Sequence, residues 1–197
     1  SSFEALIDLA GQCARELGKN ARVNAVNMKL SYKDGIHGLC PQGTQAVLYA
    51  LSGLKSIGQI SGNADWFSFG PTNPSGSDNK GSFSKSGYFN DKIKITQKNG
   101  SWNGTYLDPK SKSMWQVGDV IAMAYTPQTQ AKVVGSTKAV GEYGHIQVWT
   151  GYSWMSDFKQ GIYIQQRRVD PNSVALWRMN DKGIAALKKQ NSNTKSV

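Results

Sequence analysis

Alternating apolar segments in the second half of the chain constrain its fold most strongly. The segment WQVGDVIAMAY, from residue 115, contains a Gly-Asp turn followed by the pattern of a buried strand. GHIQVWTG and YSWMSDF, from residue 144, are typical of a hairpin that turns at Thr150 and Gly151. QGIYIQQRR, from residue 160, is predicted to be a further strand. This half of the chain therefore favours a meander of antiparallel strands.

Helical patterns precede these strands. Residues 3 to 18 place apolar side chains at helical spacing, with Cys13 on the apolar side and Gly18 at the end. A second helix is predicted to begin at Cys40 and Pro41, because proline suits the first helical turn and the following residues supply an apolar face. Helices followed by strands predict an α+β fold, with Cys40 at a helix N-terminus.

The remaining segments are more polar. Residues 52 to 116 are rich in Gly, Ser, Asn and Lys, with turn signals such as KNGSWNGT and one alternating stretch, DKIKITQ. We expect loops and hairpins there, with a polar, loop-rich insertion at about residues 70 to 110. A short helix is predicted around Asn180 to Lys189, followed by a frayed tail at about residues 190 to 197. The 197 residues are predicted to form a single domain, 1 to 197.

The charge balance narrows the choice of partner. Lys and Arg number 23 against 13 Asp and Glu, a formal charge of +10. Such a charge is typical of proteins that meet nucleic acid, a membrane surface or a bacterial wall, and also of generic basic soluble proteins. No run of five or six basic residues resembles a nucleic-acid arm, and no run approaches the length of a membrane span. We therefore expect no nucleic-acid binding and no membrane insertion.

Cys40 is the first candidate catalytic residue. A cysteine attacks as its thiolate, and a helix N-terminus favours that form because backbone N–H groups and the helix dipole attract negative charge. The same N–H groups could bind the oxyanion of a tetrahedral intermediate. The alternative is a structural cysteine. Cys13 is predicted on a buried helix face, so we expect no disulfide between it and an exposed Cys40.

His145 is the candidate general base. Strand alternation places His145 and Gln147 on the same face of the predicted strand. The hairpin would return Asp157 beside His145, at a cross-strand spacing of about 5 Å, where its carboxylate could accept a hydrogen bond from one imidazole nitrogen. The alternatives are a packed strand histidine at 145 and a turn aspartate at 157.

Other polar residues compete for these roles. His37, three residues before Cys40, is the second candidate for the base, and is otherwise a plain loop residue. Gln147 is the second candidate for orienting the imidazole. Asp34 and Asp119 each neighbour a glycine and are predicted to be turn residues. Because the histidines and cysteines lack the spacings of a zinc site, and no calcium-loop or phosphate-loop pattern is present, we expect no metal and no cofactor.

Four motifs, taken in order, resemble a known family. They are Cys40 at the start of a helix, then ISGNADW, then WQVGDVIAM, then GHIQVWTG followed by WMSDF. Over residues 32 to 160 the chain resembles papain-like cell-wall hydrolases of the CHAP and NlpC types. This resemblance implies a papain-like α+β fold, in which N-terminal helices carry the nucleophile at a helix N-terminus and pack on an antiparallel sheet. The residues after Cys40, Pro-Gln-Gly-Thr, differ from both types, which makes this a divergent member.

The resemblance also implies a mechanism. Cys40 would be the nucleophile, His145 the general base and Asp157 the group that orients the imidazole. The reaction would cleave an amide bond in the stem peptide or cross-link of peptidoglycan through a cysteine thioester. The candidate substrate-binding residues are Tyr32, His37, Gln147 and Trp66.

The resemblance leaves three functions open. A wall hydrolase without a visible signal peptide would reach the bacterial periplasm by another route, as a type VI secretion effector or a phage lysis enzyme. An effector would also imply an immunity protein in the producing cell. A papain-like protease or acyltransferase that acts on a protein would use the same three residues. A non-catalytic cationic module would instead bind glycan or nucleic acid through its tryptophans. We expect a monomer.

Overall fold

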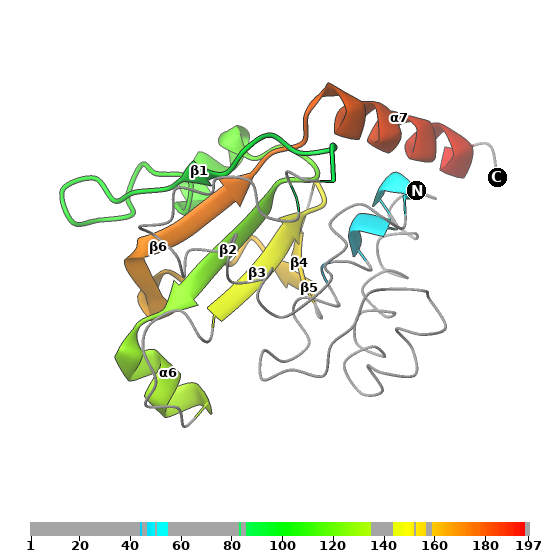
Figure 1. Cartoon of the computed structure of the whole chain (residues 1–197). Helices are drawn as coiled ribbons and strands as arrows, with labels where there is room; N and C mark the ends of the chain where they lie inside the picture. The colour runs from blue at the N-terminus through cyan, green and yellow to red at the C-terminus, as the bar shows by residue number, and fades with distance from the viewer. Residues whose placement is uncertain are drawn as a thin grey trace.

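The computed structural model describes residues 44, 47–49, 51–54, 83, 86–134, 144–151, 153–156 and 159–195. Within these residues, six strands form one antiparallel sheet in the order β1-β6-β2-β3-β4-β5 (Figure 1). The strands are β1 (Ile93–Lys94), β2 (Val120–Tyr125), β3 (Gly144–Trp149), β4 (Trp154–Met155), β5 (Lys159–Gly161) and β6 (Val169–Trp177).

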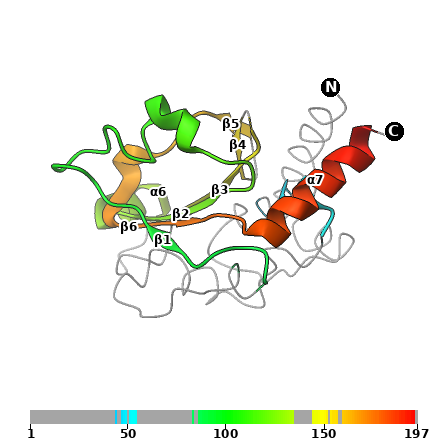
Figure 2. The same cartoon turned by 90° about the horizontal axis from the view of Figure 1, so that it is seen from above.

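Helical segments accompany the sheet. They are the 3-10 helices η1 (Pro109–Met114) and η2 (Gln166–Arg168), and the α-helices α6 (Pro127–Val134) and α7 (Asp181–Lys195). Residues 44, 47–49 and 51–52 are also helical, and we call them the N-terminal helical segment. Figure 2 shows η1 on one side of the sheet and α7 beyond the end of β6.

Strand alternation gives the sheet two buried faces. On one face, Ile146 and Val148 of β3 join Val47, Leu48 and Leu51 of the N-terminal helical segment in an apolar cluster. The opposite face carries an aromatic cluster, in which the ring centroid of Trp115 lies 4.9 Å from that of Trp149 and 5.1 Å from that of Trp154. His145 and Gln147 belong to this second face by alternation, since Met123, the partner of His145 in β2, packs in the aromatic cluster.

The α+β class and the antiparallel sheet are confirmed. The Gly-Asp turn opens β2 as predicted, and Gly118 there has a φ of +90° that favours glycine. The hairpin at Thr150 is also confirmed, because Thr150 N donates to the Ser153 carbonyl at 3.0 Å and Trp149 pairs with Trp154. Within the segment DKIKITQ, β1 is a strand.

The prediction of one strand over residues 160 to 168 is wrong. Only Gln160 and Gly161 belong to a strand, and residues 166–168 form η2. The strand that pairs with β2 on the side opposite β3 is β6, which the sequence does not reveal because Asp170, Pro171 and Asn172 interrupt its apolar pattern. α6 was not expected either. α7 runs to Lys195, where the sequence predicts a helix ending at Lys189 and a frayed tail.

Part of the expected polar insertion belongs to the sheet and its core. β1 lies within residues 70 to 110, and so do the buried side chains of Trp102, Tyr106 and Leu107. The predicted helix over residues 3 to 18 lies outside the described residues. In the part of the chain that the structure describes, no helix is long and apolar enough to cross a membrane.

Candidate functional site

His145 lies near the start of β3, directly after a glycine that the packing requires. A Cβ atom on Gly144 would collide with the main-chain carbonyl of Met123 in β2, so only glycine allows the two strands to approach this closely. His145 pairs with Met123 and its side chain is buried. The Gly-His pair noticed in the sequence therefore has a structural cause: the glycine seats the histidine against the neighbouring strand.

The imidazole of His145 is hydrogen-bonded to an amide from the edge of the sheet. Its Nε2 lies 2.9 Å from Oε1 of Gln160 in β5. The pairing of β4 with β5 shifts by one residue, from Trp154 opposite Gly161 to Met155 opposite Lys159, so Gln160 is the extra residue of a β-bulge. Bulges redirect side chains near functional sites. Here the bulge directs Gln160 past the end of the two-residue strand β4 toward His145.

Two further polar side chains hold the Gln160 amide. Ser156 Oγ donates to Gln160 Oε1 at 3.0 Å, and Gln160 Nε2 donates to Gln147 Oε1 at 2.8 Å. Because Gln160 Nε2 is directed at Gln147, the amide oxygen faces the imidazole, where it accepts from Nε2 of His145 in the tautomer that is protonated at Nε2. That tautomer makes Nδ1 the basic nitrogen of the ring.

Gln147 therefore acts on the imidazole through Gln160. Its side chain is fully buried, and its Nε2 donates to no acceptor among the residues that the structure describes. Burying a donor without an acceptor costs free energy. Such a group in a native structure calls for an explanation, and a role in a functional site is one.

The N-terminal helical segment docks beside this network. Thr44 Oγ1 donates to the carbonyl oxygen of Ile146, the residue after His145, at 3.3 Å. Thr44 and Leu48 are fully buried, and Leu48 packs in the same apolar cluster as Ile146. Cys40 stands four positions before Thr44 in the sequence. The segment that follows the candidate nucleophile thus packs on the strand of the candidate base.

An ion pair between the buried Asp119 and the partly exposed Arg178 lies at the Gly-Asp turn. The carboxylate of Asp119 accepts from Nε and Nη2 of Arg178 at 3.0 and 2.8 Å, from the hydroxyl of Tyr106 at 2.6 Å and from the backbone N–H of Gln116 at 3.0 Å. Burial, followed by the negative charge of Asp119, raises the pKa of the Tyr106 hydroxyl far above its usual range.

This arrangement extends what the sequence predicts for Asp119. The residue closes the turn as expected, because its N–H donates to the Gln116 carbonyl at 2.9 Å. It also fixes β6 to the turn before β2 through Arg178, whose pKa is raised chiefly by the hydrogen bond to Asp119. Asp119 therefore has a structural role far from His145, and it stays outside the candidate site.

Gln160 and Ser156 are the site residues that the sequence analysis missed. A residue that reaches the site from a bulge cannot be found by counting a regular alternation. The signal in the sequence is the glycine of Lys-Gln-Gly, because an isolated glycine in a strand pattern suggests a bulge. In the structure Gly161 has a φ of +63°, which favours glycine.

Several predicted site residues lie outside the described residues: Tyr32, His37, Cys40, Trp66 and Asp157. Of the predicted set, the structure places His145 and Gln147, and Gln160 joins them in one network. Among the described residues no group of three His, Cys, Asp or Glu could hold a metal ion. Comparison with protein-family models, curated proteins and solved structures finds no match to this chain.

Proposed function

We propose that this protein is a papain-like cysteine amidase that cleaves an amide bond in the stem peptide or cross-link of bacterial peptidoglycan. The observation that carries the proposal is the buried hydrogen bond between His145 Nε2 and Gln160 Oε1. It gives the imidazole a fixed orientation and a basic Nδ1, which a general base requires. The hydrogen bond from Thr44 to Ile146 supports Cys40 as the nucleophile that acts with His145, because it packs the segment after Cys40 against the strand of His145.

The proposed reaction has two stages. His145 Nδ1 takes the proton of Cys40, and the thiolate attacks the amide carbon to form a tetrahedral intermediate. The C–N bond then breaks, the imidazolium gives its proton to the departing amine, and a thioester remains on Cys40. In the second stage His145 takes a proton from water, whose oxygen attacks the thioester, and the carboxylic acid is released with the thiol restored.

Gln160 takes the orienting role in this mechanism. The sequence predicts that role for Asp157, which lies outside the described residues, whereas Gln160 is hydrogen-bonded to the ring. An amide orients the imidazole without placing a negative charge beside it.

The substrate class rests on the order of the sequence motifs and on charge. The formal charge of +10 suits an anionic wall, because opposite charge raises the local concentration of the protein at the polymer. The protein would act in the bacterial periplasm as an antibacterial effector or a lysis enzyme. An effector implies an immunity protein in the producing cell, and a pull-down from that cell with the Cys40→Ala variant tests this partner.

Digestion of purified Gram-negative peptidoglycan tests the proposed function. Wild-type protein, Cys40→Ala and His145→Ala are each incubated with the polymer, and the released fragments are identified by mass spectrometry. We expect new fragments from the wild type alone, with masses that identify the amide bond. Folded wild-type protein that releases no fragments would overturn the assignment of substrate.

A further inference from the structure

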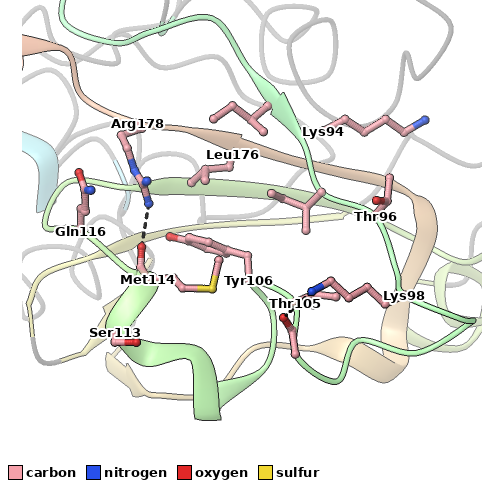
Figure 3. A pocket seen from close by; sticks show the side chains of 13 residues that line it. Lys94, Thr96, Lys98, Thr105, Tyr106, Ser113, Met114, Gln116, Leu176 and Arg178 are labelled. Carbon is pink, nitrogen blue, oxygen red and sulfur yellow. Dashed lines mark hydrogen bonds between the residues drawn. The ribbon is translucent and has the colours of Figure 1, made fainter.

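A groove of about 560 Å³ lies at the edge of the sheet formed by β1, and the strands β6 and β2 separate β1 from the strand β3 that carries His145. One wall is the extended segment 93–96 together with Lys98, and the other comes from residues 104–106 and the end of η1. Leu176 of β6 and the buried ring of Tyr106 form its floor. Figure 3 shows Arg178 toward one end and Lys94 and Lys98 toward the other.

The charged side chains among the described lining residues are all cationic. Lys94, Lys98 and Arg178 line it, and none of the described residues that line it is acidic. Lys98 is held over the groove by a 3.3 Å hydrogen bond from its Nζ to the Gly104 carbonyl. Arg178 is fixed by Asp119 and the Met114 carbonyl through Nε and Nη2, and Nη1 makes none of these bonds. The charged groups are thus positioned before any ligand arrives, which lowers the entropic cost of binding.

Among the described residues, the main chain of the groove wall is the outer edge of the sheet. β1 is the end strand of the sheet, and Ile95 N donates to the Val174 carbonyl of β6 at 3.0 Å. In an antiparallel pair, successive residues direct their backbone groups to opposite sides. Lys94 and Thr96 therefore direct their N–H and C=O groups away from β6, where an added strand could bind them.

Apolar side chains complete the groove. Ile93 is 47% exposed and Met114 is 48% exposed, which makes them two of the four large apolar side chains that are exposed in the described part of the chain. Both line the groove. A ligand that covers them would bury apolar surface, while its charged groups meet the lysines.

We propose that this groove is a docking site for an extended acidic peptide segment of a partner protein, which adds as a strand to β1. Its carboxylates would meet Lys94, Lys98 and Arg178, and an apolar side chain between them would cover Ile93 and Met114. Single-stranded nucleic acid fits less well, because such binding relies on exposed aromatic faces, and Tyr106, the one aromatic side chain among the described lining residues, is buried. This site is independent of the proposed catalytic function.

Titration of the whole chain with the peptide Ac-Glu-Val-Glu-Val-Glu-NH2 tests the proposal. Binding is monitored through the NMR chemical shifts of the backbone amides. We expect shifts concentrated at residues 93–98 and 104–106, and no comparable shifts with Ac-Lys-Val-Lys-Val-Lys-NH2. The pair Lys94→Glu with Lys98→Glu should weaken binding roughly tenfold. The matched control is Lys188→Glu with Lys189→Glu on α7, where both side chains are exposed and the change in net charge is the same.

A second variant tests the main-chain contact. Thr96→Pro removes an N–H that points away from β6, a position where an edge strand tolerates proline, and should weaken binding while the thermal unfolding temperature changes little. If Thr96→Pro unfolds the protein, the lysine pair and its control decide alone. Peptide shifts outside the groove, equal weakening by the control pair, or tighter binding of a dT6 oligonucleotide at the same residues would each overturn the proposal.

Discussion

At the scale of single residues, the amide of Gln160 determines how His145 can react. Gln160 Oε1 accepts from the imidazole, and Gln147 and Ser156 hold the amide from its other sides. This arrangement presents a neutral acceptor to Nε2 and leaves the proton-transfer role to Nδ1. The chemistry of the base is therefore set by a residue that the strand pattern alone does not reveal.

Gln160→Ala should lower kcat on soluble peptidoglycan fragments by about 100-fold, because a small misplacement of a catalytic group has an effect of that order. Gln160→Glu should instead raise the pKa of His145, since a carboxylate beside the ring favours the imidazolium. Nitrogen-15 NMR of the imidazoles measures that pKa directly, with His37 as an internal reference. Loss of activity in Asp157→Ala but not in Gln160→Ala would contradict the orienting role of Gln160.

Asp119→Ala should destabilise the protein by about 3 kcal/mol, because it leaves Arg178 and the Tyr106 hydroxyl without their buried acceptor. Urea unfolding followed by tryptophan fluorescence gives the free energy of unfolding. Asp91→Ala is the matched control, since Asp91 is exposed and its removal should change stability by less than about 0.5 kcal/mol. Equal stability of the two variants would show that the ion pair is not a structural link.

At the scale of elements, the outcome of each prediction depends on whether its signal is local. The Gly-Asp turn and the hairpin at Thr150 are specified by residues next to each other, and both are confirmed. β6 is assembled from two pairings separated by an irregular stretch around Pro171, so no regular alternation marks it. The bulge at Gln160 depends on how β4 and β5 meet, which only the assembled sheet determines.

Leu48→Ala should destabilise the protein by about 3 kcal/mol, because Leu48 is fully buried where the N-terminal helical segment packs against β3. Leu187→Ala, on the partly buried face of α7, should cost less. Urea unfolding compares the two. A smaller loss for Leu48→Ala than for Leu187→Ala would mean that the helical segment does not dock on the sheet as described.

At the scale of the whole molecule, three regions with different chemistry lie around one sheet. The N-terminal helical segment packs on one face, the aromatic cluster covers the other, and the cationic groove lies at the β1 edge. The α+β class followed from the order of helical and alternating segments. The groove did not, because it depends on residues from β1, η1 and β6 that only the folded sheet brings together.

The net charge predicts how the protein meets its substrate. Binding of the Cys40→Ala variant to peptidoglycan, measured by co-sedimentation, should fall as the salt concentration rises from about 50 to about 500 mM, because ions screen the attraction between exposed charges. A neutral glycan such as dextran serves as the control and should retain little protein at any salt concentration. Salt-independent binding to peptidoglycan would contradict a role for charge.

The central claim is that Cys40 and His145 form one catalytic pair. It is tested most directly by the rate at which iodoacetamide alkylates Cys40 as a function of pH, with Cys13 monitored in the same digest by mass spectrometry. We predict that Cys40 reacts well below pH 8.5, the usual range for a free thiol, and that His145→Ala shifts its profile upward while Cys13 is unaffected. A Cys40 profile that resembles a free thiol and does not change in folded His145→Ala would contradict the claim.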